Sequence, residues 1–160
     1  MKTLDYAVKL DILSEGYDGK TQWFQPRASV IPPNTAVITA TRSDLSGSDG
    51  LFLVYTRRGA NNDHVFRNRA PLFMAQVDVE RLRVVRQTER VLLPEKGAQF
   101  GNFGVVNASA GESWVLDAEG MQGDAEQPFD IARTVHRGAN NRLYLCRILW
   151  NKPNQMVTTR

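Results

Sequence analysis

The sequence predicts an all-β domain, and three observations lead to this prediction. About nine short apolar runs are separated by turns rich in Gly, Ser, Asn, Asp and Pro, and no long amphipathic helix is found among them. β-branched residues dominate runs such as 35–41, TAVITAT. The pentapeptide RGANN occurs at 58–62 and again at 137–141, and an apolar run follows each copy. Such an identity, placed alike in two hairpins, predicts a repeat architecture, and the whole pattern is typical of a β-sandwich or a propeller-like fold.

Composition indicates one folded domain, 1–160, with a polar tail from about residue 151. Hydrophobic residues make up 42% and charged residues 23%, which argues against wholesale disorder. The net charge of +3 is too small to imply a nucleic-acid partner, and basic and aromatic residues do not alternate in the patterns of nucleic-acid-binding modules. No apolar run approaches membrane-spanning length, and charges interrupt the N-terminal stretch that a signal peptide would need. We therefore expect a cytoplasmic protein without a membrane partner.

The expected elements of the first half follow from alternation and from turn residues. Residues 6–13 alternate as in a strand, and 14–20 (SEGYDGK) form a turn. Prolines bound a short strand on both sides, and the β-branched run after it ends at a polar loop, 42–50. The expected strands are 6–13, 28–31, 35–41, 51–55, 72–77, 82–85 and 91–93.

The second half has the same character. Residues 103–107 and 113–116 are expected to form a hairpin, because Ser, Gly and Ala occupy the connection between them. The acidic stretch 117–130 has no period and is expected to be a loop, and 142–150 is the last strand. Helical turns are expected only at 78–83 and 130–135. The only cysteine, Cys146, lies within the last apolar run, so we expect a small core residue.

The connection between strands 51–55 and 72–77 is polar and cationic, which is a common way to hold an anionic or sugar-like ligand on a rigid sheet. From 56 to 90 the chain carries eight arginines and no lysine. The planar guanidinium suits carboxylate or phosphate, so this bias favours an anionic ligand. The polar residues of the connection are Arg57, Arg58, Asn61, Asn62, Asp63, His64, Arg67 and Arg69.

Four segments resemble the sialidase (neuraminidase) superfamily, the proteins with bacterial-neuraminidase (BNR) repeats. These segments are PRASVIP at 26–32, LFLVYTRRGANNDHVFRNRAPLFMAQVD at 51–78, ERVLLPEKGAQFGNFGV at 89–105 and YLCRILWNKPN at 144–154. The resemblance implies a β-propeller of four-stranded blades with the ligand at the mouth of the central channel. With blades of about 40–45 residues, this chain would supply about three to four of them, so a partial propeller is expected. A homo-oligomer could then complete the ring.

The resemblance also implies an exo-sialidase-type glycoside hydrolase acting on acidic sugars. In that family three arginines hold the substrate carboxylate, a tyrosine activated by a glutamate is the nucleophile, and an aspartate is the acid/base. Carried over, Arg27 corresponds to the first arginine and Arg67 or Arg69 to another. Asp49, in SGSDG, resembles the acid/base, and Glu119 is a candidate for the glutamate. The tyrosines available as nucleophile include Tyr17, Tyr55 and Tyr144.

Other interpretations of these residues stay open. A non-catalytic carbohydrate-binding or structural β domain would keep the scaffold and lack the chemistry. On a strand, Arg67 and Arg69 would share a face and either bind an anion or pair with Asp63 or Asp78. Asp49 also suits an ordinary turn.

His64 is a candidate general base beside Asp63, or a hydrogen-bond donor to a turn carbonyl. Neither a Cys cluster nor His-x-x-x-His occurs, so no metal or cofactor is expected. The expected ligand is an acidic sugar or glycoconjugate.

Overall fold

The computed structural model describes residues 6–14, 37–41, 50–78, 80–100, 102–123, 126–151 and 153–154. Nearly all regular structure in these ranges is β, which confirms the all-β prediction. The elements are β1 (Tyr6–Ser14), β2 (Val37–Thr41), β3 (Gly50–Tyr55), η1 (Phe66–Asn68), β4 (Leu72–Asp78), β5 (Arg83–Val84), η2 (Arg86–Thr88), β6 (Arg90–Leu93), β7 (Gly104–Ser109), β8 (Glu112–Ala118), α1 (Ile131–His136) and β9 (Leu143–Trp150).

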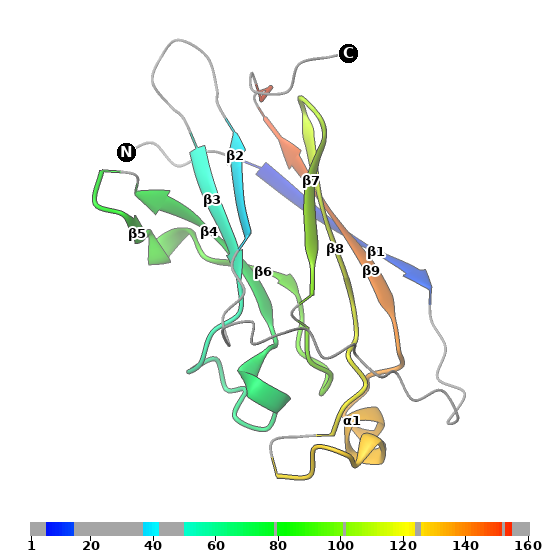
Figure 1. Cartoon of the computed structure of the whole chain (residues 1–160). Coiled ribbons are helices and arrows are strands. Elements are labelled where there is room, and N and C mark those ends of the chain that lie inside the picture. Colours follow the sequence, from blue (N-terminus) through cyan, green and yellow to red (C-terminus); the bar gives the residue numbers. More distant parts are fainter. Residues whose placement is uncertain are drawn as a thin grey trace.

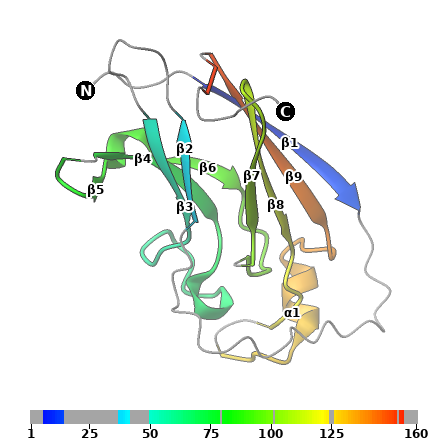
Figure 2. The same cartoon turned by 45° about the horizontal axis from the view of Figure 1, so that its top comes forward.

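The strands form two antiparallel sheets (Figure 1). The first has the order β1-β9-β8-β7, so the first and last described strands lie side by side. In the second, β2, β3 and β4 follow one another, and β5 and β6 both pair with β4. The sheets also approach each other at their edges, because β2 contacts β7 and β6 contacts both β1 and β9 (Figure 2).

Buried and more exposed side chains alternate along the strands of the first sheet, and this alternation shows which face of each strand lies on the core. In β8 and β9 every second side chain is buried, as expected for strands with one face on a core. Strand β4 instead reads as a continuous apolar run because both of its faces are covered. Leu72 and Met74 face the first sheet, while Phe73 and Ala75 form a smaller cluster with Tyr55 on the other face.

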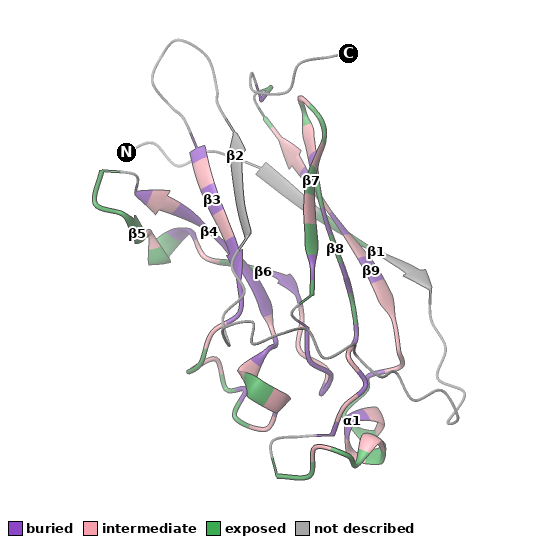
Figure 3. Ribbon diagram, in the orientation of Figure 1, coloured by how far each residue is buried: buried purple, intermediate pink, exposed green. Residues whose placement is uncertain are grey.

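One apolar core joins the two sheets (Figure 3). Its members include Phe52 and Met74 from the second sheet and Cys146 and Ile148 from the first. Each of these four side chains is at most 1% exposed. Burial of a side chain of this size stabilises the fold by roughly 1.5–3 kcal/mol. The structure therefore confirms Cys146 as a core residue.

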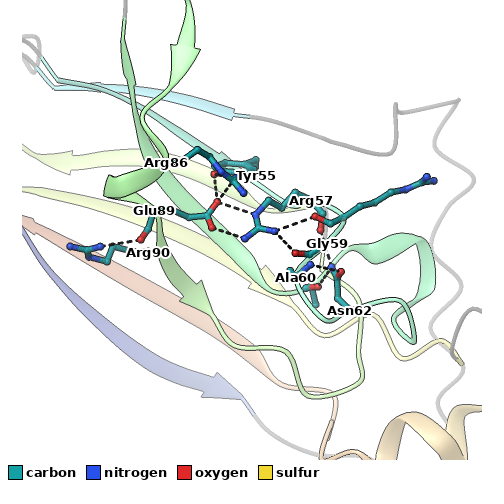
Figure 4. Close-up of polar contacts among 10 residues, drawn as sticks. Tyr55, Arg57, Gly59, Ala60, Asn62, Arg86, Glu89 and Arg90 are labelled. Atoms are coloured by element: carbon teal, nitrogen blue, oxygen red, sulfur yellow. Dashed lines mark hydrogen bonds and ion pairs between the residues drawn. The ribbon is translucent and has the colours of Figure 1, made fainter.

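Asn62 organises the connection between β3 and β4 (Figure 4). This residue is fully buried, and its amide nitrogen donates to the carbonyl oxygens of Arg57 (2.9 Å), Asn68 (3.1 Å) and Ala70 (2.6 Å). Its amide oxygen accepts the N–H of Ala60 at 3.2 Å. A polar connection can turn back between two strands here because this one side chain satisfies the backbone groups that the turn leaves unpaired.

Most sequence-predicted elements are confirmed. The observed strands match those expected at 6–13, 35–41, 51–55, 72–77, 82–85, 91–93 and 142–150, the hairpin expected at 103–107 and 113–116 is β7–β8, and the helical turn expected at 130–135 is α1. The strand expected at 28–31 lies outside the described residues. Strand β8 extends to Ala118, into the stretch expected to be a loop.

Two expectations were wrong. A helical turn was expected at 78–83, but residues 80–82 form a turn that belongs to no helix. The side chain of Asp78 accepts the backbone N–H of Arg81 in this turn at 3.1 Å. The two RGANN copies do not occupy equivalent hairpins, since the first connects β3 to β4 and the second connects α1 to β9. Their backbones also differ, with positive φ at Asn61 in the first copy but at Asn141 in the second. The identity of the pentapeptides therefore does not make a structural repeat.

Asn62→Ala should lower the free energy of unfolding by about 2–4 kcal/mol, because it leaves buried carbonyl groups without donors. Urea denaturation measures this loss. Asp63→Ala is the matched control, because this exposed neighbour makes one side-chain bond, to Asn68 at 3.2 Å. The control should change stability by less than about 0.5 kcal/mol. Equal losses for the two variants would contradict this role of Asn62.

Candidate functional site

Three connections meet at one end of the two sheets, where α1 lies in Figure 1. We call this region the loop end and define it by residues 56–71, 94–100, 119–123 and 126–142. His64 and Glu95 join the first two connections through an ion pair of 3.1 Å. Gln99 and Gly120 join the second and third through paired backbone hydrogen bonds. The sequence-predicted residues His64, Arg67, Arg69 and Glu119 all lie here.

Arg69 is a buried arginine, and Asp117 is a described carboxylate whose charge acts on it. Arg69 is only 4% exposed, and no carboxylate of the described residues forms an ion pair with its guanidinium. Burial lowers the pKa of Arg69, the nearby charge of Arg67 lowers it further, and Asp117 of β8 acts in the opposite direction. An arginine nevertheless stays protonated in proteins, so a full positive charge is held between the sheets.

The geometry expected for Arg67 and Arg69 was wrong. They do not share the face of a strand, because η1 replaces the strand and Arg67 takes a positive φ of 58°. Arg67 is exposed, and its guanidinium carbon lies 5.1 Å from the centre of the Phe66 ring.

The expected alternative of an ion-pair network is also not formed. Asp63 accepts a hydrogen bond from Asn68, and Asp78 pairs with Arg81 at 3.2 Å and with Arg83 at 3.9 Å. Neither Arg67 nor Arg69 has an ion pair with a described carboxylate.

Glu119 contacts a tyrosine. Its Oε1 accepts the hydroxyl hydrogen of Tyr144 at 3.0 Å, and its Oε2 accepts the backbone N–H groups of Asn140 (2.8 Å) and Arg142 (2.9 Å). Burial raises the pKa of the Tyr144 phenol, and Glu119 adds to this effect while Arg142 opposes it. The pair is enclosed, with Glu119 at 3% and Tyr144 at 1% exposure.

Phe100 links this pair to Arg69. The backbone N–H of Phe100 donates to the carbonyl of Arg69 at 2.6 Å, and its ring lies edge-on to Tyr144 with 6.0 Å between the ring centres. In addition, Asp117, which acts on Arg69, is the cross-strand partner of Tyr144. Phe100 and Asp117 therefore connect Arg69 to the Tyr144–Glu119 pair at the loop end.

A second tyrosine–glutamate pair lies on the other face of the β3–β4 sheet (Figure 4). The Tyr55 hydroxyl donates to Glu89, and Arg57 donates to the same carboxylate through Nε (3.0 Å) and Nη2 (2.7 Å). A second arginine, Arg86, donates from its Nη1 to Oε2 of the same carboxylate at 2.6 Å. Arg57 also lies over the ring of Phe73, at 4.6 Å from its centre.

The charges of this cluster are mutually satisfied. Burial alone would raise the pKa of Glu89, but hydrogen bonds from Arg57 and Tyr55 and the charges of Arg57 and Arg86 lower it overall. Burial, together with Glu89, raises the pKa of Tyr55 to about 12. Both arginines already donate to Glu89, so an anionic ligand would have to displace this carboxylate. The arrangement accordingly ties β3 to η2 rather than forming a ready anion site.

No pattern in the sequence indicated Glu89 as a partner of Tyr55 and Arg57. The Tyr55–Glu89 contact spans 34 positions in the chain, and no local spacing signals it. His64 has a partner that its sequence neighbours did not indicate, because its Nε2 lies 3.1 Å from Oε1 of Glu95, and its expected role stays a prediction. Arg27 and Asp49 lie outside the described residues, so their roles stay predictions.

Among the described residues, no three His, Cys, Asp or Glu side chains are grouped in a way that could hold a metal ion. The helical segments of the same ranges are too short to cross a membrane. Comparison of the chain with family models, with curated proteins and with solved structures finds no match.

Glu89→Gln should destabilise the protein at neutral pH by roughly 1–3 kcal/mol, because it removes an ionised acceptor from Tyr55, Arg57 and Arg86. Glu89 has a lowered pKa in the folded state. Its contribution is therefore complete above the unfolded value of 4.5 and is lost as the pH falls through the folded pKa. Urea denaturation at about pH 7 and about pH 3 should show a large and then a small difference from the unsubstituted chain.

Glu126→Gln is the control, because the Glu126 side chain is 81% exposed and lies 3.7 Å from Arg133. An exposed pair of this kind contributes at most about 1 kcal/mol. A difference between Glu89→Gln and the unsubstituted chain that stays constant with pH would contradict the ionic role of Glu89.

Proposed function

We propose that the loop end binds an acidic sugar, with Arg69 holding the carboxylate, in the manner of a sialidase-like protein. The observation that carries the proposal is Arg69, a buried arginine whose guanidinium forms no ion pair with a described carboxylate, although the charge of Asp117 acts on it. An uncompensated buried charge destabilises a fold by several kcal/mol. A ligand carboxylate would satisfy this charge through two parallel N–H···O bonds.

The charges around Arg69 favour a monoanion over a dianion. Arg67 adds a second positive charge at the rim, but Asp117 and Glu119 are buried carboxylates of the same region. A phosphate dianion would be repelled by both carboxylates, whereas a sugar acid carries one negative charge and presents hydroxyl groups elsewhere. Sugar hydroxyls can donate to carboxylates, so this ligand class fits both signs of charge.

Hydrolysis of an acidic glycoside is the second candidate function, and one observation favours it. The Tyr144 hydroxyl donates to Glu119, which is the pairing that a tyrosine nucleophile with a glutamate base requires. Against immediate catalysis, Tyr144 is 1% exposed, so a glycosidic carbon reaches its oxygen only after the loop end opens. Arg69 is 4% exposed, so binding of a carboxylate to its guanidinium also requires the loop end to open. Binding needs contact with this one cation and no bond cleavage, and we therefore place binding first.

We also propose that the two sheets are propeller-type blades. The first sheet has four antiparallel strands and combines the N-terminal β1 with the C-terminal β7, β8 and β9, an arrangement that suits closure of a ring. The second is built mainly from consecutive strands. A ring needs at least about four blades, which is more than the two sheets of the described residues supply.

Arg69→Met should weaken sugar-acid binding and leave the fold intact. Removal of an unpaired buried cation relieves desolvation, so its melting temperature without ligand should equal or exceed that of the unsubstituted chain. N-acetylneuraminic acid should raise the melting temperature of the unsubstituted chain only. By isothermal titration calorimetry, the loss of one bidentate charge-assisted contact should weaken binding roughly 10- to 100-fold.

Arg58→Met is the matched control, because Arg58 is an exposed arginine of the same connection and should leave affinity within about twofold of the unsubstituted chain. The methyl ester of the sugar should bind at least about tenfold more weakly than the acid. Binding that is equal for acid and ester, or equal in Arg69→Met, would contradict the proposed site.

Hydrolysis is tested separately with the fluorogenic 4-methylumbelliferyl glycoside of N-acetylneuraminic acid. If Tyr144 is the nucleophile, Tyr144→Phe should reduce fluorophore release by at least about 100-fold and leave sugar-acid affinity within a few-fold. Tyr55→Phe is the matched control and should retain release. Absence of release from the unsubstituted chain, together with saturable binding, would reject hydrolysis and keep the binding function.

A further inference from the structure

The outer face of the first sheet carries a band of exposed apolar side chains. We call this surface the β7–β8 face and define it by Val106, Trp114 and Leu116, which are 56%, 39% and 42% exposed. Leu145 and Leu149 of β9 continue it and are partly buried. Exposed residues colour β7 green along part of its length in Figure 3. Adjacent large apolar residues on a sheet face indicate an interaction surface, whereas scattered ones do not.

Strand register shows how these side chains are arranged. Cross-strand partners share a face, so Val106, Trp114, Arg147 and Lys9 form one row across the four strands. The next row consists of Gly104, Leu116, Leu145 and Asp11. Each row is therefore apolar toward β7 and ends in a charge at β1, positive in the first row and negative in the second.

The charges on this face balance. Glu112 pairs with Arg147 and accepts the indole N–H of Trp114 at 2.7 Å. Lys9 and Asp11 are exposed on β1, with the charge of Lys9 acting on Glu112 and that of Asp11 acting on Arg147. Two positive and two negative charges leave the face without a net charge, so a second identical face would not be repelled by it.

We propose that a second copy of this chain docks on the β7–β8 face, sheet against sheet, around a two-fold axis. The axis runs across the strands, between the row of Lys9 and the row of Asp11. Such an axis exchanges the two rows, so Lys9 of one protomer lies over Asp11 of its partner, and Trp114 lies over Leu116. The Lys9–Asp11 ion pair therefore forms twice, because the interface is self-complementary.

The surface chemistry favours this occupant over a sugar or a nucleic acid. Val106 lies beside Trp114 on one side, and the charged neighbours Glu112 and Arg147 already pair with each other, whereas a sugar platform needs polar groups that reach the hydroxyls around the ring. Charge balance offers no attraction to phosphates. The proposal is independent of the Arg69 site, which lies between the sheets rather than on this outer face.

Strand spacing gives the expected strength of the dimer. Four strands of about six residues present a face of roughly 15 Å by 20 Å, or about 300 Å² for each partner, which is less than the roughly 800 Å² per partner of a standard-size interface. We therefore expect a weak dimer that forms at high concentration, with a dissociation constant of roughly 10–100 μM.

Light scattering on a sizing column, run up to about 1 mM protein, tests the interface. The chain has a mass of 18.0 kDa, and the unsubstituted protein should approach twice this mass. Lys9→Asp and Asp11→Lys should each remain at the monomer mass, because each places like charges opposite one another in a homodimer. An equimolar mixture of the two variants should restore the dimer mass, because the pairs between different chains are then opposite in sign.

Leu82→Lys is the control off this face, at a side chain that is 84% exposed, and Val106→Lys is the variant on it. The control should dimerise as the unsubstituted chain does, and Val106→Lys should not. A monomer mass at every concentration would overturn the proposal, as would dimers of the single charge variants or a mixture that stays monomeric. Quenching of Trp114 fluorescence by neutral oligosaccharides in a chain that remains monomeric would assign the face to a glycan and overturn it as well.

Discussion

The apolar core shared by the two sheets is the constraint on which the rest of the structure depends. Phe52 and Met74 from one sheet meet Cys146 and Ile148 from the other, and strict alternation in β8 and β9 follows from this contact. The core fixes the distance between the sheets at their centre. The connections are thereby gathered at one end, where polar groups must find partners between two apolar layers.

At the loop end, buried polar side chains differ in how many hydrogen-bond partners they have. Asn62 and Glu119 each serve several backbone groups, and both are buried, so they stabilise the connections around them. Arg69 is equally enclosed but forms no ion pair with a described carboxylate. Because the surrounding connections are held by their own hydrogen bonds, the fold can keep one buried charge in place.

The sequence allowed the strands to be predicted because alternation and turn chemistry are local signals. It also pointed to Arg69 and Glu119, through an arginine-rich connection and a family resemblance. It could not show that Arg67 leaves the strand conformation with a positive φ, nor that Tyr55 meets Glu89. Side-chain contacts between distant strands leave no periodicity. The two RGANN copies are a local signal that misled the prediction, since five identical residues adopt different backbone conformations in different surroundings.

Arginine side-chain NMR is the most direct test of the central claim that the guanidinium of Arg69 binds an anionic ligand. The Nε–H resonance of Arg69 is assigned by its absence from the Arg69→Met spectrum. Titration with N-acetylneuraminic acid should move this resonance to a saturating shift, and the methyl ester should leave it in place. A resonance that stays unchanged while the sugar acid perturbs other arginines would contradict the account.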